Sequence, residues 1–415
     1  MSVLHYRRSR SERRYRRSGS QHHHRRGGSG RRPRAPRSLA FLAGSLAAGM
    51  LLTACGGSTD SGSAGSGDGE GDIGPGIAAP KDLKPFEFGR PAGEKPDLPK
   101  RIAWANTSDA EFFLQITNSI ELAAKERGLE FVTAIANDDS AKNIEQIETF
   151  LQRGVGALCI QPLDANAQAP LMQRAIESGA AVMSLVTPPS TVQAVADQYK
   201  VGQAQGLAAA KYITEELDGK AKVVYFNNDT IEVLKARHQG VLDGLRTAGA
   251  GVEIVADVQP PAITQEGGFK ALSTVLQKEP DIDVVLGGDT HVLGALSALE
   301  SAKAVKPHMY LSGIDGDEQA LAEVGEKGIY RASFAFAYPL MGYAWAQFAA
   351  DWLEGKPVPQ VMQFNAIELN SPETIAAYKA DMKDVATTWK NAETYFTLLG
   401  SVDYEHRDQY INDAA

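Results

Sequence analysis

The segment from residue 101 to residue 135 reads RIAWANTSDAEFFLQITNSIELAAKERGLEFVTAI. It begins with an apolar run at 102–105, continues with apolar residues at helical spacing over 112–127, stops at Gly128, and ends in a second apolar run at 130–135. This order predicts a strand, a helix and a strand. Two strands joined by one helix are typical of a parallel sheet whose faces are covered by helices.

The same alternation continues along the chain after residue 135. It predicts helices at 140–151, with Ser140 as N-cap, and at 167–178, and strands at 157–160 and 181–185. It restarts after Asp197 and closes with a helix at 339–353 that has Pro339 in its first turn. Two such blocks predict an α/β protein of two doubly wound, Rossmann-like lobes with parallel sheets and an interlobe ligand cleft. The second block is expected to contain helices at 202–216, 233–248, 268–277, 292–302 and 318–324, and strands at 222–226, 252–258, 284–286, 310–313 and 330–334.

The head of the chain has a different composition. Residues 1–54 contain 13 Arg and one acidic residue, Glu12, so they carry a formal charge of about +12 and leave about −21 on the rest of a chain of charge −9. The acidic body argues against nucleic acid as the main partner, because a phosphate backbone requires Lys and Arg. An RNA-binding arm is the alternative interpretation of the arginines at 7–37.

An apolar run of 14 residues at 39–52 follows this basic head and leads into Thr53-Ala54-Cys55. The run is shorter than the about 20 residues of a membrane span and has the length of a signal-peptide core. Leu52-Thr53-Ala54-Cys55 resembles the bacterial lipoprotein motif, which implies cleavage before Cys55 and lipid on its thiol and new amino group. A chance cysteine after an apolar helix is the alternative. We expect a lipoprotein signal peptide at 1–54 and a membrane anchor at Cys55.

The second cysteine and the next segment point to a buried strand and a tether. Cys159 lies in the apolar run 157–160 and is expected to be buried in a strand. Residues 55–99 are rich in Gly, Ser and Asp and then in Pro, which predicts a tether that is flexible first and stiffer later. We expect no cofactor and no metal. Gly154-Val155-Gly156 precedes a strand, so it is not a dinucleotide loop, and the histidines at 22–24 lie in the segment expected to be removed.

Six short segments carry a family resemblance. They are Asp109-Ala110-Glu111-Phe112-Phe113, Gln161-Pro162-Leu163-Asp164, Gly179-Ala180-Ala181-Val182, Ala236-Arg237-His238-Gln239-Gly240, Asp289 with Gly294-Ala295, and Gly313-Ile314-Asp315-Gly316. In this order they resemble motifs of the ribose/galactose-type periplasmic sugar-binding proteins of ABC transporters, and the resemblance covers about residues 100–367. It implies two lobes joined by three hinge crossovers, near 197–200, 335–337 and 359–364. The N-terminal lobe is then 100–198 plus 337–365, the C-terminal lobe is 199–336, and a C-terminal extension follows at 366–415.

The resemblance implies a small sugar-like or polyol ligand held between the lobes. In the family, aromatics such as Phe112 and Phe113 stack on the apolar faces of a sugar ring; the alternative is a hydrophobic pair at the start of a helix. Arg237 offers a planar fork of donors to hydroxyls or a carboxylate. Its alternative is a surface arginine paired with Asp243 or Glu232.

Two aspartates follow strands of the second block. Asp315 can accept two hydrogen bonds from hydroxyls, or it is the N-cap of the next helix. Asp289 is placed similarly, or it caps a helix that starts at Thr290. The remaining candidate ligand-binding residues are Asp109, Thr187 and Phe336.

Five polar positions of the family's ribose binders are different here, and four of them are small or apolar. Ala110 and Gly288 replace asparagines, Val186-Thr187 replaces an Asp-Arg pair, and Phe336 replaces the hinge glutamine. A buried hydroxyl without a partner costs about 1–3 kcal/mol. We therefore expect a smaller, deoxy or partly apolar ligand, or one contacted from other loops. The polar residues in those loops are Thr107, Ser108 and Asn228.

These observations predict an extracytoplasmic solute-binding lipoprotein, monomeric, that delivers its ligand to ABC permease subunits. Walker A, Gly-x-Ser-x-Gly and His-Glu-x-x-His motifs are absent from the sequence, and we do not expect an enzyme. The alternatives are a sensory lipoprotein that signals to a membrane partner and, with fold-level support alone, an enzyme on the same scaffold.

Overall fold

The computed structural model describes residues 83–109, 111–231, 233–326 and 328–410. By its internal contacts the chain divides into Met1–Ser66 and Gly67–Ala415, and all described residues belong to the second unit. The predicted signal peptide, Cys55, the first part of the predicted tether and Ala110 lie outside the described residues. Within the described ranges, the helices are all too short or too polar to cross a membrane.

The N-terminal lobe is built on a seven-stranded sheet in the order β13-β11-β5-β4-β3-β1-β2. Its strands are parallel except for β13, which runs antiparallel to β11. The elements up to the first crossover are β1 (Arg101–Asn106), α1 (Glu111–Glu126), β2 (Glu130–Ile135), α2 (Ser140–Arg153), β3 (Ala157–Ile160), α3 (Ala165–Glu177), β4 (Ala181–Leu185) and β5 (Val192–Ala196).

The C-terminal lobe is built on a six-stranded sheet in the order β12-β10-β9-β8-β6-β7. It is parallel except for the edge strand β12, which is antiparallel to β10. Its elements are α4 (Gln198–Glu216), β6 (Ala221–Phe226), α5 (Leu234–Arg246), β7 (Val252–Val258), α6 (Gln265–Leu276), β8 (Val284–Leu286), α7 (Asp289–Ala302), β9 (Tyr310–Asp315), α8 (Glu318–Gly325) and β10 (Tyr330–Ala335).

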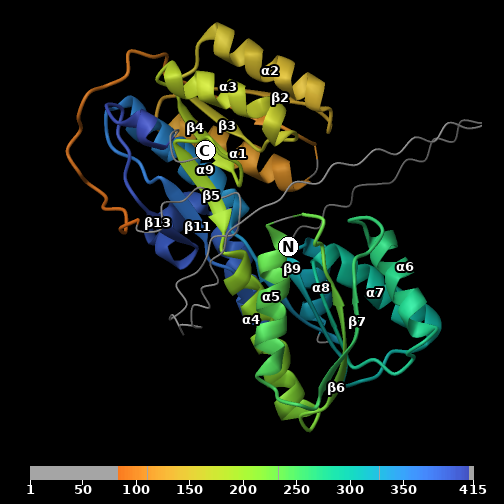
Figure 1. Ribbon diagram of the computed structural model, residues 1–415. Helices are drawn as coiled ribbons and strands as arrows, with labels where there is room; N and C mark the ends of the chain where they lie inside the picture. The colour runs from red at the N-terminus through yellow and green to blue at the C-terminus, as the bar shows by residue number, and fades with distance from the viewer. Residues whose placement is uncertain (1–82, 110, 232, 327, 411–415) are drawn as a thin grey trace, which may run out of the picture. The chain divides into compact units, whose positions relative to one another are not determined.

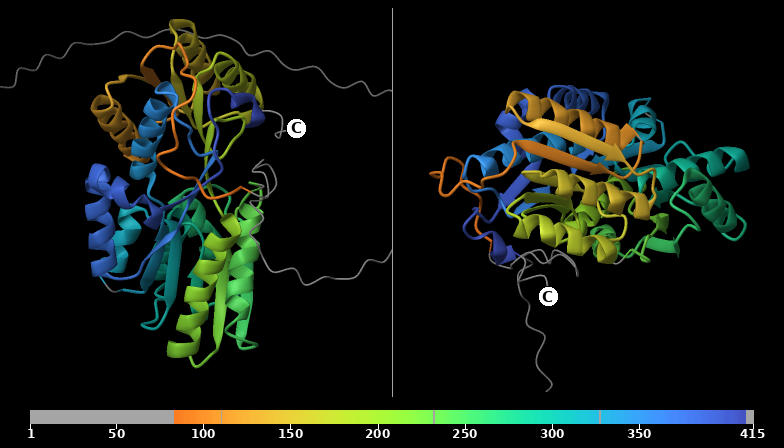
Figure 2. Two further views of the ribbon diagram at one scale, coloured as in Figure 1. Left: turned by 90° about the vertical axis from the view of Figure 1, so that its left-hand side faces the viewer. Right: turned by 90° about the horizontal axis from the view of Figure 1, so that it is seen from above.

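Both sheets are buried on both faces, and helices lie on either side of each sheet in Figure 2. In β1, Ile102 and Trp104 join one hydrophobic cluster, whereas Ala103 and Ala105 join the cluster on the opposite face. This follows from the alternation of side chains along a strand. The prediction of two doubly wound α/β lobes is confirmed, and Cys159 is fully buried in β3 as expected.

Helices α4 and α5 run side by side in the C-terminal lobe (Figure 1). A Cβ atom on Gly202 would collide with the backbone oxygen of Arg237, and one on Gly240 would collide with the backbone oxygen of Tyr199. The glycines therefore let the two backbones touch. This contact fixes the start of α5, where Arg237 lies.

The chain passes between the two sheets at Asp197, at Phe336–Ala337 and at Asn365–Ala366. The first passage is shorter than the predicted 197–200, because Asp197 caps α4 by accepting a hydrogen bond from the backbone N of Lys200 at 3.0 Å. The third passage lies directly after the predicted neighbourhood of 359–364, because Val361–Phe364 forms β11 beside β5. After α9 (Tyr338–Leu353) and β11, the chain returns to the C-terminal lobe as β12 (Ile367–Leu369).

The structure differs from the sequence prediction at two further places, each for a local reason. Strand β5 was not predicted, because it is short and buried throughout and so carries no alternating pattern. The N-cap of α2 is Asp139 rather than Ser140, since the Asp139 carboxylate accepts a hydrogen bond from the backbone N of Lys142 at 3.0 Å.

The segments that flank the two blocks pack on the body. The tail forms α10 (Pro372–Lys383), α11 (Val385–Thr388), a 3-10 turn (Trp389–Thr394), β13 (Phe396–Leu399) and a last turn (Arg407–Tyr410). Residues 83–99 were predicted as part of the tether, yet Phe86 N donates to Leu398 O at 2.9 Å and Gly93 N to Gly355 O at 2.7 Å. This part of the predicted tether is therefore attached to the N-terminal lobe.

Candidate functional site

A cavity of about 430 Å³ lies where α1, the end of β9 and the crossover into α9 meet. Phe112 enters it from α1, Asp315 from β9, and Phe336 from the crossover. The structure thus brings together three of the residues that the sequence placed at the ligand site. Three lining residues that were not predicted are Gln115, Tyr338 and Tyr378.

One wall of this cavity is aromatic. The rings of Phe112 and Tyr338 meet edge to face with centroids 4.5 Å apart, and those of Phe336 and Tyr338 are 5.7 Å apart. Phe113 packs against Phe112 at 4.7 Å and against the core of the N-terminal lobe. Phe112 therefore lines the cavity, whereas Phe113 packs behind it against the core. Tyr338 contacts both Phe112 and Phe336, so it continues the aromatic wall between them.

The opposite wall carries Asp315 in an unusual backbone conformation. Its φ angle is +118°, and the next residue, Gly316, has φ +77°. Positive φ is unfavourable for residues other than glycine and persists only where neighbouring groups hold it. The Asp289 carboxylate supplies this support, since it accepts hydrogen bonds from Gly316 N at 2.8 Å and Asp317 N at 2.9 Å. The N-cap of α8 is Asp317, so Asp315 does not cap that helix.

Asp289 is fully buried and organises the loop that carries Asp315. Its carboxylate also accepts hydrogen bonds from the hydroxyls of Tyr330 and Ser333, both at 2.7 Å. Burial raises the pKa of Asp289 to about 7, although the bonds from Ser333 and Tyr330 oppose that change. Helix α7 begins at Asp289 itself, after Gly288 as N-cap. Asp289 thus lies behind the cavity wall, and it is not the helix cap considered above.

The side chain of Asp315 is exposed to the cavity, yet it is surrounded closely enough that lost solvation raises its pKa. The positive charge of Arg237 opposes this rise, whereas Asp317 adds to it. Arg237 also lowers the pKa of the Tyr338 hydroxyl, which burial raises. Arg237 thus acts electrostatically on both groups, although it is not one of the residues that line the cavity.

Arg237 is oriented by a neighbour in α4. Its Nε donates to Oε1 of Gln198 at 2.8 Å. Asp243, one of the two alternative partners, is bonded instead to Arg246 and to Tyr199. The other alternative partner, Glu232, lies outside the described residues.

The two remaining predicted residues do not line this cavity. Thr187 closes a tight turn, in which its backbone N donates to Leu185 O at 2.9 Å around Val186, whose φ is +69°. A β-branched residue at positive φ is strained. Asp109 is exposed in the loop before α1. Near the same edge, Thr107 Oγ1 and Gln161 Oε1 follow β1 and β3 and are buried without a hydrogen-bond partner in the described part of the chain.

The sequence carried a signal for Tyr338 that was missed. Tyr338 is an aromatic residue directly after a predicted crossover, next to Phe336 and before Pro339. An aromatic at such a position can face the cleft from the hinge. Nothing local to the sequence identifies Gln115 or Tyr378, because they reach the cavity through the packing of α1 and of the tail.

Known proteins share this architecture. A family model described as the periplasmic binding protein domain matches residues 102–357. The ribose import binding protein RbsB of Bacillus subtilis is 29% identical over 299 residues, which cover 68% of this chain and 90% of that protein. The D-ribose/D-allose-binding protein of Pseudomonas aeruginosa is 29% identical over 224 residues, 50% of this chain and 68% of that protein.

Solved structures agree with this in fold. The periplasmic ribose ABC transporter protein from Conexibacter woesei has a TM-score of 0.61 at 22% identity, covering 69% of this chain and 97% of that one. A solute-binding protein from Bacillus halodurans with bound myo-inositol has a TM-score of 0.57 at 19% identity, covering 68% and 98%. Since the family model matches more than half of its residues, the chain belongs to the periplasmic binding protein domain family.

Proposed function

We propose that this protein is the solute-binding component of an ABC importer and that it holds a sugar or polyol between its two lobes. The ligand is released unchanged to permease subunits, and the protein acts as a monomer. Members of the family are extracytoplasmic binding proteins of transport systems, so catalysis is not expected.

The proposal rests on one observation: the same cavity has an aromatic wall and a wall that carries a carboxylate. Phe112 and Tyr338 offer ring faces and edges to the C–H groups of a sugar or cyclitol. Asp315 offers a carboxylate to its hydroxyls, and Arg237, oriented by Gln198, adds donors nearby. A ring with one apolar face and a rim of hydroxyls is complementary to both.

Other groups complete the proposed contacts. Thr107 Oγ1 and Gln161 Oε1 are buried without protein partners, and a ligand hydroxyl would remove that cost of about 1–3 kcal/mol each. Asp109, Phe113 and Thr187 remain candidates for ligand contact, although none of them lines the cavity. We omit Asp289, because four protein donors occupy its oxygens.

The names of similar proteins favour small polyhydroxylated ligands. They include binders of ribose and of D-ribose/D-allose, and a structure with bound myo-inositol. D-ribose, D-allose and myo-inositol are therefore the first probes. At least one should raise the melting temperature of the purified protein and give a saturable calorimetric titration, since binding to the folded state alone stabilises it. If a broad panel of sugars and polyols gives neither signal, the proposed ligand class is wrong.

The membrane anchor is a separate part of the proposal. It rests on the Leu-Thr-Ala-Cys sequence at residues 52–55. The variant Cys55→Ser should leave the membrane fraction or remain unprocessed. Cys159→Ser, a change at the other cysteine, should fractionate like the protein of unaltered sequence. A Cys55→Ser protein that is cleaved at the same place and stays with the membrane would refute lipid attachment.

A further inference from the structure

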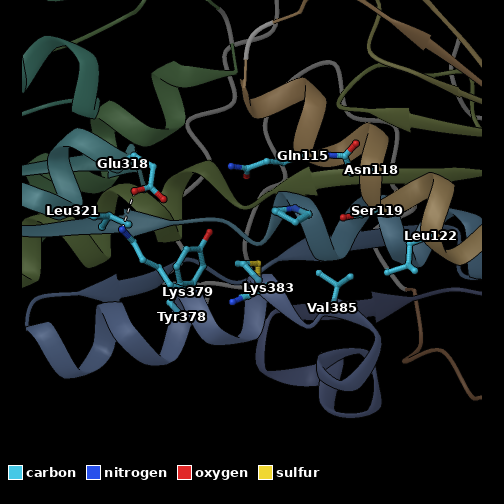
Figure 3. Close-up of a pocket in the computed structure, with 13 residues that line it drawn as sticks. Gln115, Asn118, Ser119, Leu122, Glu318, Leu321, Tyr378, Lys379, Lys383 and Val385 are labelled. Atoms are coloured by element: carbon cyan, nitrogen blue, oxygen red, sulfur yellow. Dashed lines mark hydrogen bonds and ion pairs between the residues drawn. The ribbon is translucent and has the colours of Figure 1, made fainter. Parts of the chain in front are cut away.

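A second cavity, of about 460 Å³, adjoins the first. It is the cavity drawn in Figure 3. The two cavities are adjacent, because Gln115, Gly316, Glu318, Pro339 and Tyr378 line both of them. A molecule bound between Phe112 and Asp315 would thus have the second cavity directly beside it.

The far wall of the second cavity is made by the tail of the chain. Figure 3 shows Tyr378 and Lys379 of α10 and Val385 of α11 facing Asn118, Ser119 and Leu122 of α1. The tail residues lie beyond residues 102–357, which the family model matches. The far wall of the second cavity therefore lies outside the part of the chain that the family model matches.

The lining combines apolar surface with polar side chains. Leu122, Met382 and Val385 supply apolar surface beside the ring of Tyr378. Ser119 also lines the cavity, although the residue as a whole is only 7% exposed. A hydroxyl in a cavity wall can donate and accept a hydrogen bond with a polar ligand.

An ion pair lies at one edge of this cavity. Lys379 of α10 pairs with Glu318 of α8 at 2.8 Å, as the dashed line in Figure 3 shows. The pair joins the tail to the C-terminal lobe, while Tyr378 donates its hydroxyl proton to the backbone oxygen of Phe336 at 2.8 Å. The wall is thus held in place by the same crossover that lines the first cavity.

We propose that the ligand has two units: one ring lies between Phe112 and Asp315, and a second hydroxylated unit, such as a glycosyl group, occupies the cavity walled by the tail. This inference rests on the proposed function. Each cavity alone falls in the range of about 300–1,000 Å³ typical of small-molecule sites. The mixed lining of the second cavity suits a sugar unit for the same reasons as the first.

Matched pairs of probes test the inference by calorimetric titration of the full chain. We would compare myo-inositol with galactinol, D-galactose with melibiose and D-glucose with cellobiose, and include D-ribose and D-allose as single units. At least one two-unit probe should bind tenfold or more tightly than its single unit. If single units bind and every two-unit probe binds equally or more weakly, the inference is wrong and the proposed function stands. If no sugar or polyol binds, both are wrong.

Two variants locate the second unit. Leu122→Trp should fill the second cavity, because Leu122 lines it and is 41% exposed. It should weaken the two-unit probe tenfold or more and leave the single unit within twofold. Leu207→Trp is the matched control, since Leu207 is 43% exposed on α4 and lies outside both cavities. Unchanged affinity for the two-unit probe in Leu122→Trp would overturn the assignment.

Removal of one hydroxyl gives a finer test. Ser119→Ala should weaken the two-unit probe by about twofold to tenfold, the effect of one neutral hydrogen bond. Ser297→Ala removes the hydroxyl of an exposed serine in α7 and should change neither affinity. A loss that is equal for single-unit and two-unit probes in Ser119→Ala would contradict the placement.

Discussion

The two walls of the cleft are built on different principles. The wall formed by Phe112, Phe336 and Tyr338 consists of rings packed edge to face against the core of the N-terminal lobe. The wall formed by Asp315 carries charge on a loop with positive φ angles, and the nearby Arg237 offsets part of that charge. The first wall needs only packing to keep its shape, whereas the second depends on hydrogen bonds made behind it.

The residues that contact the ligand therefore differ from those that hold the walls in place. Phe112 of the aromatic wall can be altered with little effect on the rest of the protein, because it is only half-buried. The support behind the charged wall cannot, since it depends on Asp289, which is fully buried. Variants of the two walls should therefore differ in whether they lose stability or affinity.

The largest effect is expected behind the charged wall. Asp289→Ala would leave three donors unpaired, because Gly316 N also donates to Ser333 Oγ at 3.1 Å, and buried unpaired donors cost about 1–3 kcal/mol each. The free energy of unfolding of the unliganded protein, measured with urea, should fall by roughly 3–5 kcal/mol. Asp281→Ala, at an aspartate that is 67% exposed and paired with Lys306, should leave this free energy nearly unchanged. Equal losses in the two variants would show that Asp289 does not support the loop.

The next effect is on affinity at the charged groups themselves. Asp315→Asn and Arg237→Gln should each weaken binding of the tightest of D-ribose, D-allose and myo-inositol by roughly tenfold to a hundredfold, the effect of a lost charged hydrogen bond. Asparagine tolerates positive φ, so the loop should keep its conformation. The unliganded melting temperatures should stay close to that of the unaltered protein. Affinities that match those of the control Asp281→Asn would remove these two residues from the site.

A smaller loss is expected at the aromatic wall. Phe112→Ala should weaken the same ligand about twofold to tenfold, because an aromatic contact contributes about 0.5–1.5 kcal/mol beyond buried area. Phe88→Ala provides the comparison, since Phe88 is 64% exposed and lies outside the cavity. An affinity for Phe112→Ala within error of the Phe88→Ala value would mean that the ligand does not stack on this wall.

The subtlest difference is in pH dependence. Loss of solvation raises the pKa of Asp315, and Arg237 opposes the rise. As the pH falls, protonation of Asp315 removes an acceptor, so affinity should drop at a higher pH than for an ordinary aspartate. In Arg237→Gln the drop should move to still higher pH, because the opposing positive charge is lost. Titrations from pH 7 downward would show it, and a shift in the opposite direction would contradict the pairing.

The sequence identifies what depends on neighbours along the chain. Phe112 and Asp315 were predicted because each follows a strand whose carboxyl end points to the cleft, and a motif of nearby residues marks both. The role of Asp289 was not foreseen, since it depends on Tyr330 and Ser333, which reach it only through the pairing of β9 with β10. The same holds for the edge strands β12 and β13, whose position in the two sheets has no local signature.

The position of the tail is the feature that local sequence patterns predict least. Its aromatic residues suggest packing on some surface, but not which one. In the structure, Trp389 packs against Phe348 of α9 with ring centroids 5.5 Å apart, and Tyr378 reaches the crossover at Phe336. These contacts join residues far apart in sequence, and only the folded chain reveals that the tail forms part of the cavity.

The central claim is that a ligand binds between the two walls and draws the lobes together. The lobes are joined by three short passages, at Asp197, Phe336–Ala337 and Asn365–Ala366, so rotation about them disturbs little packing. A ligand that contacts both walls favours the closed form by its differential contacts. Small-angle X-ray scattering with and without a saturating ligand tests this directly. We predict a smaller radius of gyration with ligand, and an unchanged radius at saturation would contradict the account.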